Sequence, residues 1–254
     1  MKPFLKYLLA SLVIVLTAAL IAVTALQADR HRARTACRHV LIENRSTAGQ
    51  RFIPDEDVLK EVERGFGTLY GVPLESLDLH AIEQIFDKKS AVKKSEVFVS
   101  YPDSSLHIRI EERIPRLRFQ TASGGFYCDR EGTLFPLQTH YTAWVPVVDG
   151  HLPIDCWWNV GPKGRRWLED ILSLTEYMSG ESRWNQRCTQ IHVERDGGIR
   201  LVFDNWEEIF LIGDCRGLDA KFRRIEQYLC SIKPVCGKQY KSVNVRFDGQ
   251  IICK

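Results

Sequence analysis

The chain has 254 residues, of which 44% are hydrophobic and 26% are charged, and its formal net charge is +3. This composition is typical of a globular protein and excludes a disordered chain. A net charge so close to zero also argues against a nucleic-acid-binding domain, which needs Lys and Arg clustered on one face.

The first predicted element is an apolar helix over residues 7–28, which contain no charged side chain. A helix of this length reaches about 30 Å, the thickness of a bilayer hydrocarbon core. The sequence therefore predicts a cytoplasmic tail at 1–6, a transmembrane helix at 7–28 and an extracytoplasmic remainder. A cleaved signal peptide is the alternative, although its apolar region is usually only about 7–15 residues long. The following arginines leave the orientation open on charge alone.

Residues 37–113 predict a unit with the order strand, helix, helix, strand, strand. A short apolar strand comes first, and two amphipathic patterns of helical period follow it. Asp78 is suited to cap the second helix. The apolar period then changes to two on both sides of a turn at 102–105, which predicts a β-hairpin. This βααββ order is that of a POTRA domain, and Pro115, which lacks a backbone donor, marks its end.

Residues 114–254 predict a second domain that is richer in strands. Short apolar segments alternate with turn signals such as Asp196-Gly197-Gly198. The strands are expected at residues 117–120, 125–128, 133–137, 145–148, 191–195, 199–203 and 208–212. Amphipathic patterns predict two helices, at 167–178 and 218–229, and a final hairpin at 240–253 closes the chain. The predicted fold is α+β: an N-terminal transmembrane helix, a βααββ POTRA domain, and a mostly antiparallel β domain with two flanking helices.

Eight cysteines lie outside the predicted membrane helix, and none forms a Cys-x-x-Cys motif. Their pairing cannot be deduced from the sequence. Cys128 and Cys253 lie in apolar strand patterns and are expected to be small buried side chains. Cys230 and Cys236 are expected to flank a Pro-containing turn and are the pair that a disulfide test should examine first.

No combination of residues predicts an active site, a cofactor site or a metal site, so the chain is interpreted as non-enzymatic. Cys188 and His192 have the spacing of metal ligands but lack the further ligands that structural zinc requires. The segment 161–164 precedes a helix but lacks the spacing of a phosphate-binding loop. His107 alternates with apolar residues and is expected to be solvated on the outer face of its strand.

Several motifs, in their order and spacing, resemble the FtsQ/DivIB cell-division family. Glu112-Arg113-Ile114-Pro115 is similar to the family's E-R-x-P junction, and the segment 127–135 is similar to its D-x-x-G turn. The segment 240–247 is similar to the family's final strand, although Asn244 stands where Asp is usual. The resemblance covers nearly the whole chain.

The resemblance implies a non-enzymatic, single-pass scaffold of the bacterial divisome, located in the inner membrane at the septum. It implies that the end of the β domain binds an FtsB-like protein paired with an FtsL-like protein, linking them to septal peptidoglycan synthesis. It also implies an FtsK-like partner for the POTRA domain, where the helix 79–88 and the strand 94–101 form a second docking surface. A POTRA-bearing chaperone or translocation module of the cell envelope is the alternative; a membrane-anchored cell-wall hydrolase would need paired catalytic groups.

The closing hairpin supplies the predicted partner-binding residues, because a hairpin at the edge of an open sheet presents backbone groups onto which another chain can add a strand. By strand alternation, Arg246 shares one face with Ser242 and Asn244, while Phe247 lies on the other face with Val243 and Val245. Arg246 and Phe247 are the leading candidates; the alternatives are a solvated charge and ordinary core packing. The complete predicted set is Tyr240, Ser242, Asn244, Arg246, Phe247 and Gly249.

Overall fold

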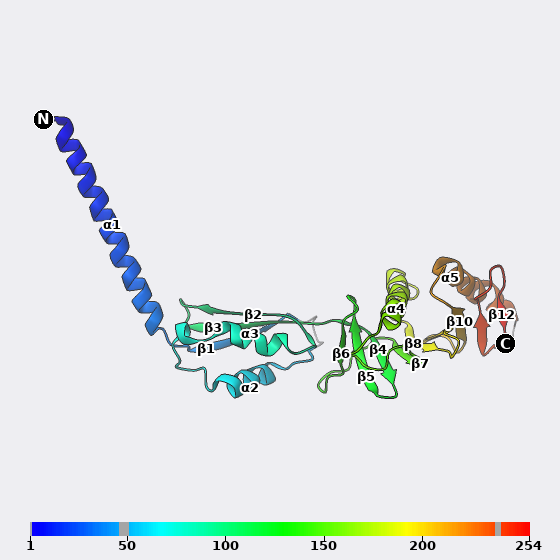
Figure 1. Cartoon of the computed structure of the whole chain (residues 1–254). Helices are drawn as coiled ribbons and strands as arrows, with labels where there is room; N and C mark the ends of the chain where they lie inside the picture. Colours follow the sequence, from blue (N-terminus) through cyan, green and yellow to red (C-terminus); the bar gives the residue numbers. More distant parts are fainter. Residues whose placement is uncertain (1, 46–50, 237–239) are drawn as a thin grey trace. The chain divides into compact units, whose positions relative to one another are not determined.

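The computed structural model describes the backbone of residues 2–45, 51–236 and 240–254; within the first helix it describes the side chains of residues 12–28, Arg32 and Arg34. The chain divides into two compact units (Figure 1). Unit 1 consists of Met1–Arg45 and Ile53–Glu112, and unit 2 consists of Ser46–Phe52 and Arg113–Lys254.

Unit 1 begins with the long helix α1, Lys2–Arg34. Among the helices in the described part of the chain, none has an apolar stretch that is long enough to cross a membrane. The predicted transmembrane helix at 7–28 is therefore wrong.

After α1, unit 1 has the order β1, α2, α3, β2, β3. The elements are β1 (His39–Asn44), α2 (Asp55–Phe66), the 3-10 turn η1 (Leu74–Ser76), α3 (Leu79–Asp87), β2 (Val92–Ser100) and β3 (Ser105–Glu112). The sheet order is β1-β3-β2, with β1 parallel to β3 and β2 antiparallel to it. The parallel pairing follows from the two helices that connect β1 to the hairpin, because parallel strands need a crossover.

The core of unit 1 lies between the helices and the sheet. Val58, Val62, Ile82 and Phe86 of the helices are fully buried against the sheet. Asp78 caps α3 as expected, since its Oδ1 accepts the Ala81 N–H at 3.0 Å.

His107 differs from its expected solvated state. Its side chain is only 15% exposed, and its ring stacks on Phe98 with centroids 4.7 Å apart. The neighbouring strand supplies the aromatic cover, and strand alternation alone cannot reveal it.

Unit 2 is built on one sheet of nine strands in the order β12-β11-β10-β9-β8-β7-β4-β5-β6. The strands are β4 (Pro115–Thr121), β5 (Gly124–Asp129), β6 (Leu134–Pro136), β7 (Val147–Gly150), β8 (Cys188–Val193), β9 (Ile199–Phe203), β10 (Ile209–Gly213), β11 (Ser242–Asn244) and β12 (Ile252–Cys253). The helices are α4 (Pro162–Gly180), α5 (Leu218–Gln227), the π-helical turn η2 (Tyr228–Ile232) and α6 (Lys233–Cys236).

The sheet of unit 2 is mixed, so the expectation of a mostly antiparallel domain needs correction. β4 pairs with β7, β7 with β8, and β10 with β11 in parallel. The predicted helices explain two of these pairings: α4 connects β7 to β8, and α5 with α6 connects β10 to β11. A helix between two neighbouring strands returns the chain to the same end of the sheet, which makes the strands parallel. The fold is α+β with mixed sheets.

One core cluster joins the sheet to both helices. Leu168, Ile171 and Leu174 of α4 and Phe222 and Ile225 of α5 all belong to it. Along the strands buried residues alternate with partly exposed ones, as in the pattern of β9, so one face of the sheet packs on the core.

The cysteines are all free thiols. Cys230 and Cys236 lie within one continuous helical segment, from α5 to α6, and do not flank a turn. Burial raises the pKa of the thiols of Cys128, Cys188 and Cys215 to about 12. These thiols are therefore poor nucleophiles.

Candidate functional site

The predicted site residues lie around the last two strands of unit 2. β11 pairs with β10 on one side and with β12 on the other. Because Ser242 and Asn244 lie on β11, their backbone groups are used within the sheet. Tyr240 precedes β11 and packs at the rim of the core. The strand with an open side is β12, which the sequence analysis did not select.

The outer side of β12 presents unpaired backbone groups. Ser242 and Lys254 exchange two N–H···O bonds of 3.1 and 3.0 Å. Since successive residues of a strand point their backbone groups to opposite sides, Ile251 and Cys253 point theirs away from β11. No backbone group within the described residues pairs with them.

The opposite edge of the same sheet is less suited to strand addition. β6 ends at Pro136, which lacks a backbone donor. A proline is a common protection of a sheet edge. Of the two edges of this sheet, β12 is therefore the one without such a proline.

Arg246 lies against the turn that follows β10. Its backbone N–H donates to Asn244 Oδ1 at 3.1 Å. Its side chain crosses Gly213, where an added Cβ would come within 2.7 Å of the Arg246 Cγ and Cδ. Gly213 also has a φ of 75°, which favours glycine. Because residue 213 is a glycine, the Arg246 side chain has room to pass over it.

The positive charge of the Arg246 guanidinium is only weakly neutralised by the nearby carboxylate of Asp196. Its Nη1 lies 3.9 Å from Asp196 Oδ2, and the side chain is 33% exposed. Its Nε is buried and has no hydrogen-bond partner in the described part of the chain. Its Cζ lies 5.8 Å from the centre of the Phe247 ring, within cation–π range. An arginine beside an exposed aromatic ring is typical of interface hot spots.

Phe247 lies in the turn after β11. The strand ends at Asn244, so Phe247 does not follow Val243 and Val245 into the core and is 50% exposed. Gly249 in the same turn has a φ of 67°. The half-exposed ring is available for contact with a partner.

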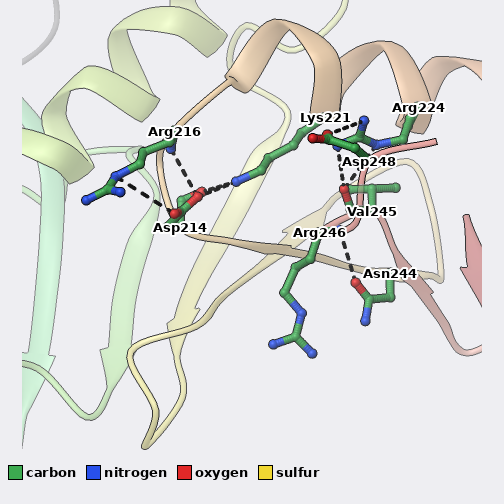
Figure 2. A network of polar contacts seen from close by, with 8 residues as sticks. All are labelled: Asp214, Arg216, Lys221, Arg224, Asn244, Val245, Arg246 and Asp248. Carbon is green, nitrogen blue, oxygen red and sulfur yellow. Dashed lines mark hydrogen bonds and ion pairs between the residues drawn. The ribbon is translucent and has the colours of Figure 1, made fainter. Parts of the chain in front are cut away.

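Arg224 of α5 holds this turn in place, as Figure 2 shows. Its Nε and Nη2 donate to the Val245 carbonyl at 3.1 and 2.9 Å, and its Nη1 lies 3.2 Å from Asp248 Oδ1. The side chain of Arg224 is only 12% exposed. The end of β11 is therefore bound to α5 by a largely buried guanidinium.

A second ion pair fixes the other side of the site. Lys221 Nζ donates to Asp214 Oδ1 at 2.5 Å and to the Asp214 carbonyl at 2.9 Å. The hydrogen bond from Lys221 Nζ to the carboxylate holds the pKa of Asp214 below its ordinary value. In Figure 2 the Arg246 guanidinium points away from both ion pairs. It borders a hollow of about 290 Å³, which is lined by Asp196, Gly197, Gly198, Ile212, Gly213, Asp214, Lys221 and Arg246.

Glu208, just before β10, is a buried carboxylate that bonds two residues of the helical segment leading to β11. Glu208 has a fully buried side chain; it accepts hydrogen bonds of 2.9 Å from the Tyr228 hydroxyl and from Lys233 Nζ. Burial by itself would raise the pKa of Glu208, but the hydrogen bonds outweigh burial and hold it below its ordinary value. Sequence patterns do not reveal this triad, because Tyr228 and Lys233 lie 20 and 25 residues after Glu208.

The residues considered above as metal ligands or as a phosphate-binding loop do not come together in one site. Cys188 belongs to the buried core, whereas His192 Nδ1 pairs with Asp149 Oδ1 at 2.8 Å on β7. Among the described residues, no group of three or more His, Cys, Asp or Glu side chains could hold a metal ion. Residues 161–164 begin α4, with Pro162 in its first turn, a favoured position for proline.

The second predicted docking surface, at α3 and β2, has a covered edge. The Val97 N–H of β2 donates to Glu83 Oε1 of α3 at 2.8 Å. The Ser95 hydroxyl bonds Asp87 Oδ1 at 2.7 Å. A partner at this surface would have to bind side chains of α3, because α3 occupies the outer side of β2.

Comparison with known proteins gives one assignment. No curated protein matches the chain. Residues 114–254, more than half of the chain, match the family model described as FtsQ/DivIB, C-terminal related. The resemblance seen in the sequence motifs is thereby confirmed. The chain belongs to the FtsQ/DivIB C-terminal related family and has a role in cell division.

Proposed function

We propose that this protein is a non-enzymatic scaffold of the divisome that acts at the septum by binding other division proteins. The observation that carries the proposal is the open side of β12, next to Arg246 and Phe247, within the part of the chain that matches the family. An FtsB-like protein, paired with an FtsL-like protein, is the proposed partner. Binding would link these proteins to septal peptidoglycan synthesis.

The proposed contact is strand addition. An extended segment of the partner would bond the outward N–H and C=O groups of Ile251 and Cys253 and continue the sheet beyond β12. Backbone pairing supplies affinity without much sequence selectivity. Selectivity would then come from the side chains beside the edge.

Arg246 is the proposed source of that selectivity. Its guanidinium has spare donors because Asp196 is 3.9 Å away and Nε is unpaired within the described residues. An acidic side chain of the partner could enter the hollow beside it and form a charge-assisted hydrogen bond. The exposed ring of Phe247 would cover an apolar residue next to that acid.

Unit 1 is proposed to be a POTRA domain that takes an FtsK-like partner. Its βααββ order and its sheet order β1-β3-β2 support this proposal. The covered edge of β2 restricts such a partner to the exposed side of α3.

The test is a binding measurement between the purified chain and the FtsB-like protein of the same organism. Arg246→Glu should weaken binding at least about tenfold, the loss expected when an interface hot spot is removed. Arg223→Glu on α5, which reverses an exposed arginine outside the site, is the matched control and should leave affinity unchanged. Equal affinities of the two variants would remove Arg246 from the site.

A crosslinking measurement tests the position of the added strand. A photoreactive amino acid at Ile252 should crosslink to the FtsB-like protein, whereas the same group at Trp158, which is 70% exposed in unit 2, should not. Crosslinks from both positions, or from Trp158 alone, would contradict strand addition at β12.

A further inference from the structure

The two edges of the unit 1 sheet differ in their protection. At β2, the side chains of Glu83 and Asp87 from α3 take up the Val97 N–H and the Ser95 hydroxyl. Covering an edge with a helix is a common way of preventing strand addition. At Val97 the β2 edge is thus already bonded by α3.

The β1 edge lacks this cover. The Arg45 N–H donates to the Ile110 carbonyl of β3 at 2.8 Å, and the His39 N–H donates at 3.4 Å to the carbonyl of Ser104, the residue just before β3. The odd-numbered residues of β1 therefore face β3. Val40 and Ile42 therefore direct their N–H and C=O groups outward. No backbone group within the described residues pairs with them. The segment 71–74 bonds the chain only before His39.

The exposed side chains of this edge match a reversed copy of themselves. We propose that a second copy of this chain occupies the β1 edge as an antiparallel strand, with Leu41 opposite its own counterpart. In this register Val40 lies opposite Ile42 of the second copy, and His39 lies opposite Glu43. Apolar residues thus face apolar ones, which stabilises cross-strand pairs. The His39 imidazole faces the Glu43 carboxylate, whose Oε2 also accepts a hydrogen bond from Arg109 Nε at 2.9 Å.

The hydrogen-bond pattern of β1 allows this register. Val40 and Ile42 would exchange N–H···O bonds across the dimer, because these are the residues whose groups point outward. Leu41 would form a non-hydrogen-bonded pair, in which side chains approach most closely. The two nearest symmetric registers would place Leu41 opposite His39 or Glu43, and both separate His39 from Glu43.

Symmetry makes the assembly closed. A two-fold contact uses the same patch on both copies, which stops growth at the dimer. The two β1 strands would join into a sheet of six strands whose outer edges are both β2, and α3 covers these. Leu41, now 44% exposed, would be buried at the dimer axis, which removes the hazard of an apolar residue on an open edge.

A cysteine crosslinking experiment on the full chain tests the register, with Cys230 and Cys236 replaced by Ser. Leu41→Cys should form a disulfide-linked dimer on mild oxidation, because its Cβ atoms would lie about 4.5–5.5 Å apart. Glu43→Cys is the matched control and should remain uncrosslinked, since its two copies would lie about 14 Å apart along the strands. A mixture of His39→Cys and Glu43→Cys chains should crosslink to each other. Efficient crosslinking of Glu43→Cys alone would overturn the register.

Analytical ultracentrifugation of the full chain tests the dimer itself. Leu41→Lys places two lysines opposite each other and should raise the dissociation constant at least about tenfold, as like charges directly opposite are destabilising. Tyr70→Lys, at another exposed site of unit 1 (49% exposed), should dimerise like the unchanged chain. A chain that stays monomeric at about 0.1 mM, or equal dimerisation of both variants, would overturn the proposal and leave the β1 edge to a strand of another protein.

Discussion

Replacing Arg224 by Met should loosen the end of β11 and weaken partner binding through it. The substitution keeps the apolar stem but removes the two hydrogen bonds to the Val245 carbonyl. Val245 is fully buried, so water cannot readily replace the lost donors. The ion pair with Asp248 contributes little, because the Asp248 side chain is 98% exposed.

The magnitude follows from the unpaired carbonyl. A buried polar group left without its partner costs about 1–3 kcal/mol, so Arg224→Met should lower the free energy of unfolding by about 2 kcal/mol. For a unit of this size that corresponds to a fall in Tm of about 6 °C. Because Arg246 follows Val245 directly, affinity for the FtsB-like partner should fall as well.

Arg223→Met on the same helix is the matched control. Arg223 is exposed, and its Nε donates to the Asp219 carbonyl within the same helix at 3.3 Å, so the free energy of unfolding should change by less than about 0.5 kcal/mol. Urea unfolding followed by circular dichroism measures both variants. Equal stability of the two would refute the role assigned to Arg224.

Three further predictions concern the same region and the thiols. Glu208→Gln should be less stable than the unchanged chain at neutral pH, and the gap should narrow as the pH falls: a lowered folded pKa gives stability that is present above the unfolded value of about 4.3 and is lost below it. A gap independent of pH in urea unfolding between about pH 6 and pH 3 would contradict this. Gly213→Ala should displace Arg246 and weaken partner binding, since the new Cβ would come within 2.7 Å of the arginine; unchanged affinity would argue against that coupling. Iodoacetamide at mildly alkaline pH should label the folded chain quickly at its two exposed cysteines, and mass spectrometry should find the buried thiols labelled only after unfolding.

Local patterns were sufficient to predict most of the helices and strands. Each strand from β4 to β10 appears close to its predicted position because alternating apolar residues need only a sheet with one buried face. The helices α2 to α5 carry apolar stripes at helical spacing, which depend on neighbours within four residues. Such signals are local and can be read without knowing which strands pair.

The apolar stretch of α1 shows a limit of local reading. An uncharged run predicted a membrane span, but among the helices in the described part of the chain none is long and apolar enough to cross a membrane.

The candidate site was only partly predictable. Arg246 was selected by motif and by residue type, but the reasons for its exposure are tertiary. Gly213, 33 residues earlier in the sequence, leaves the space for its side chain, and Asp196 supplies only a distant carboxylate.

The sequence by itself determined the helices and strands, the family and the final hairpin, because these depend on residue patterns within short segments. Only the tertiary structure decided which strands are parallel, that β12 and not β11 is the open edge, and that β2 is covered while β1 is open. Pairing brings together strands distant in the chain, and an edge exists only where no other strand arrives. That property belongs to the assembled sheet and not to any one segment of the chain.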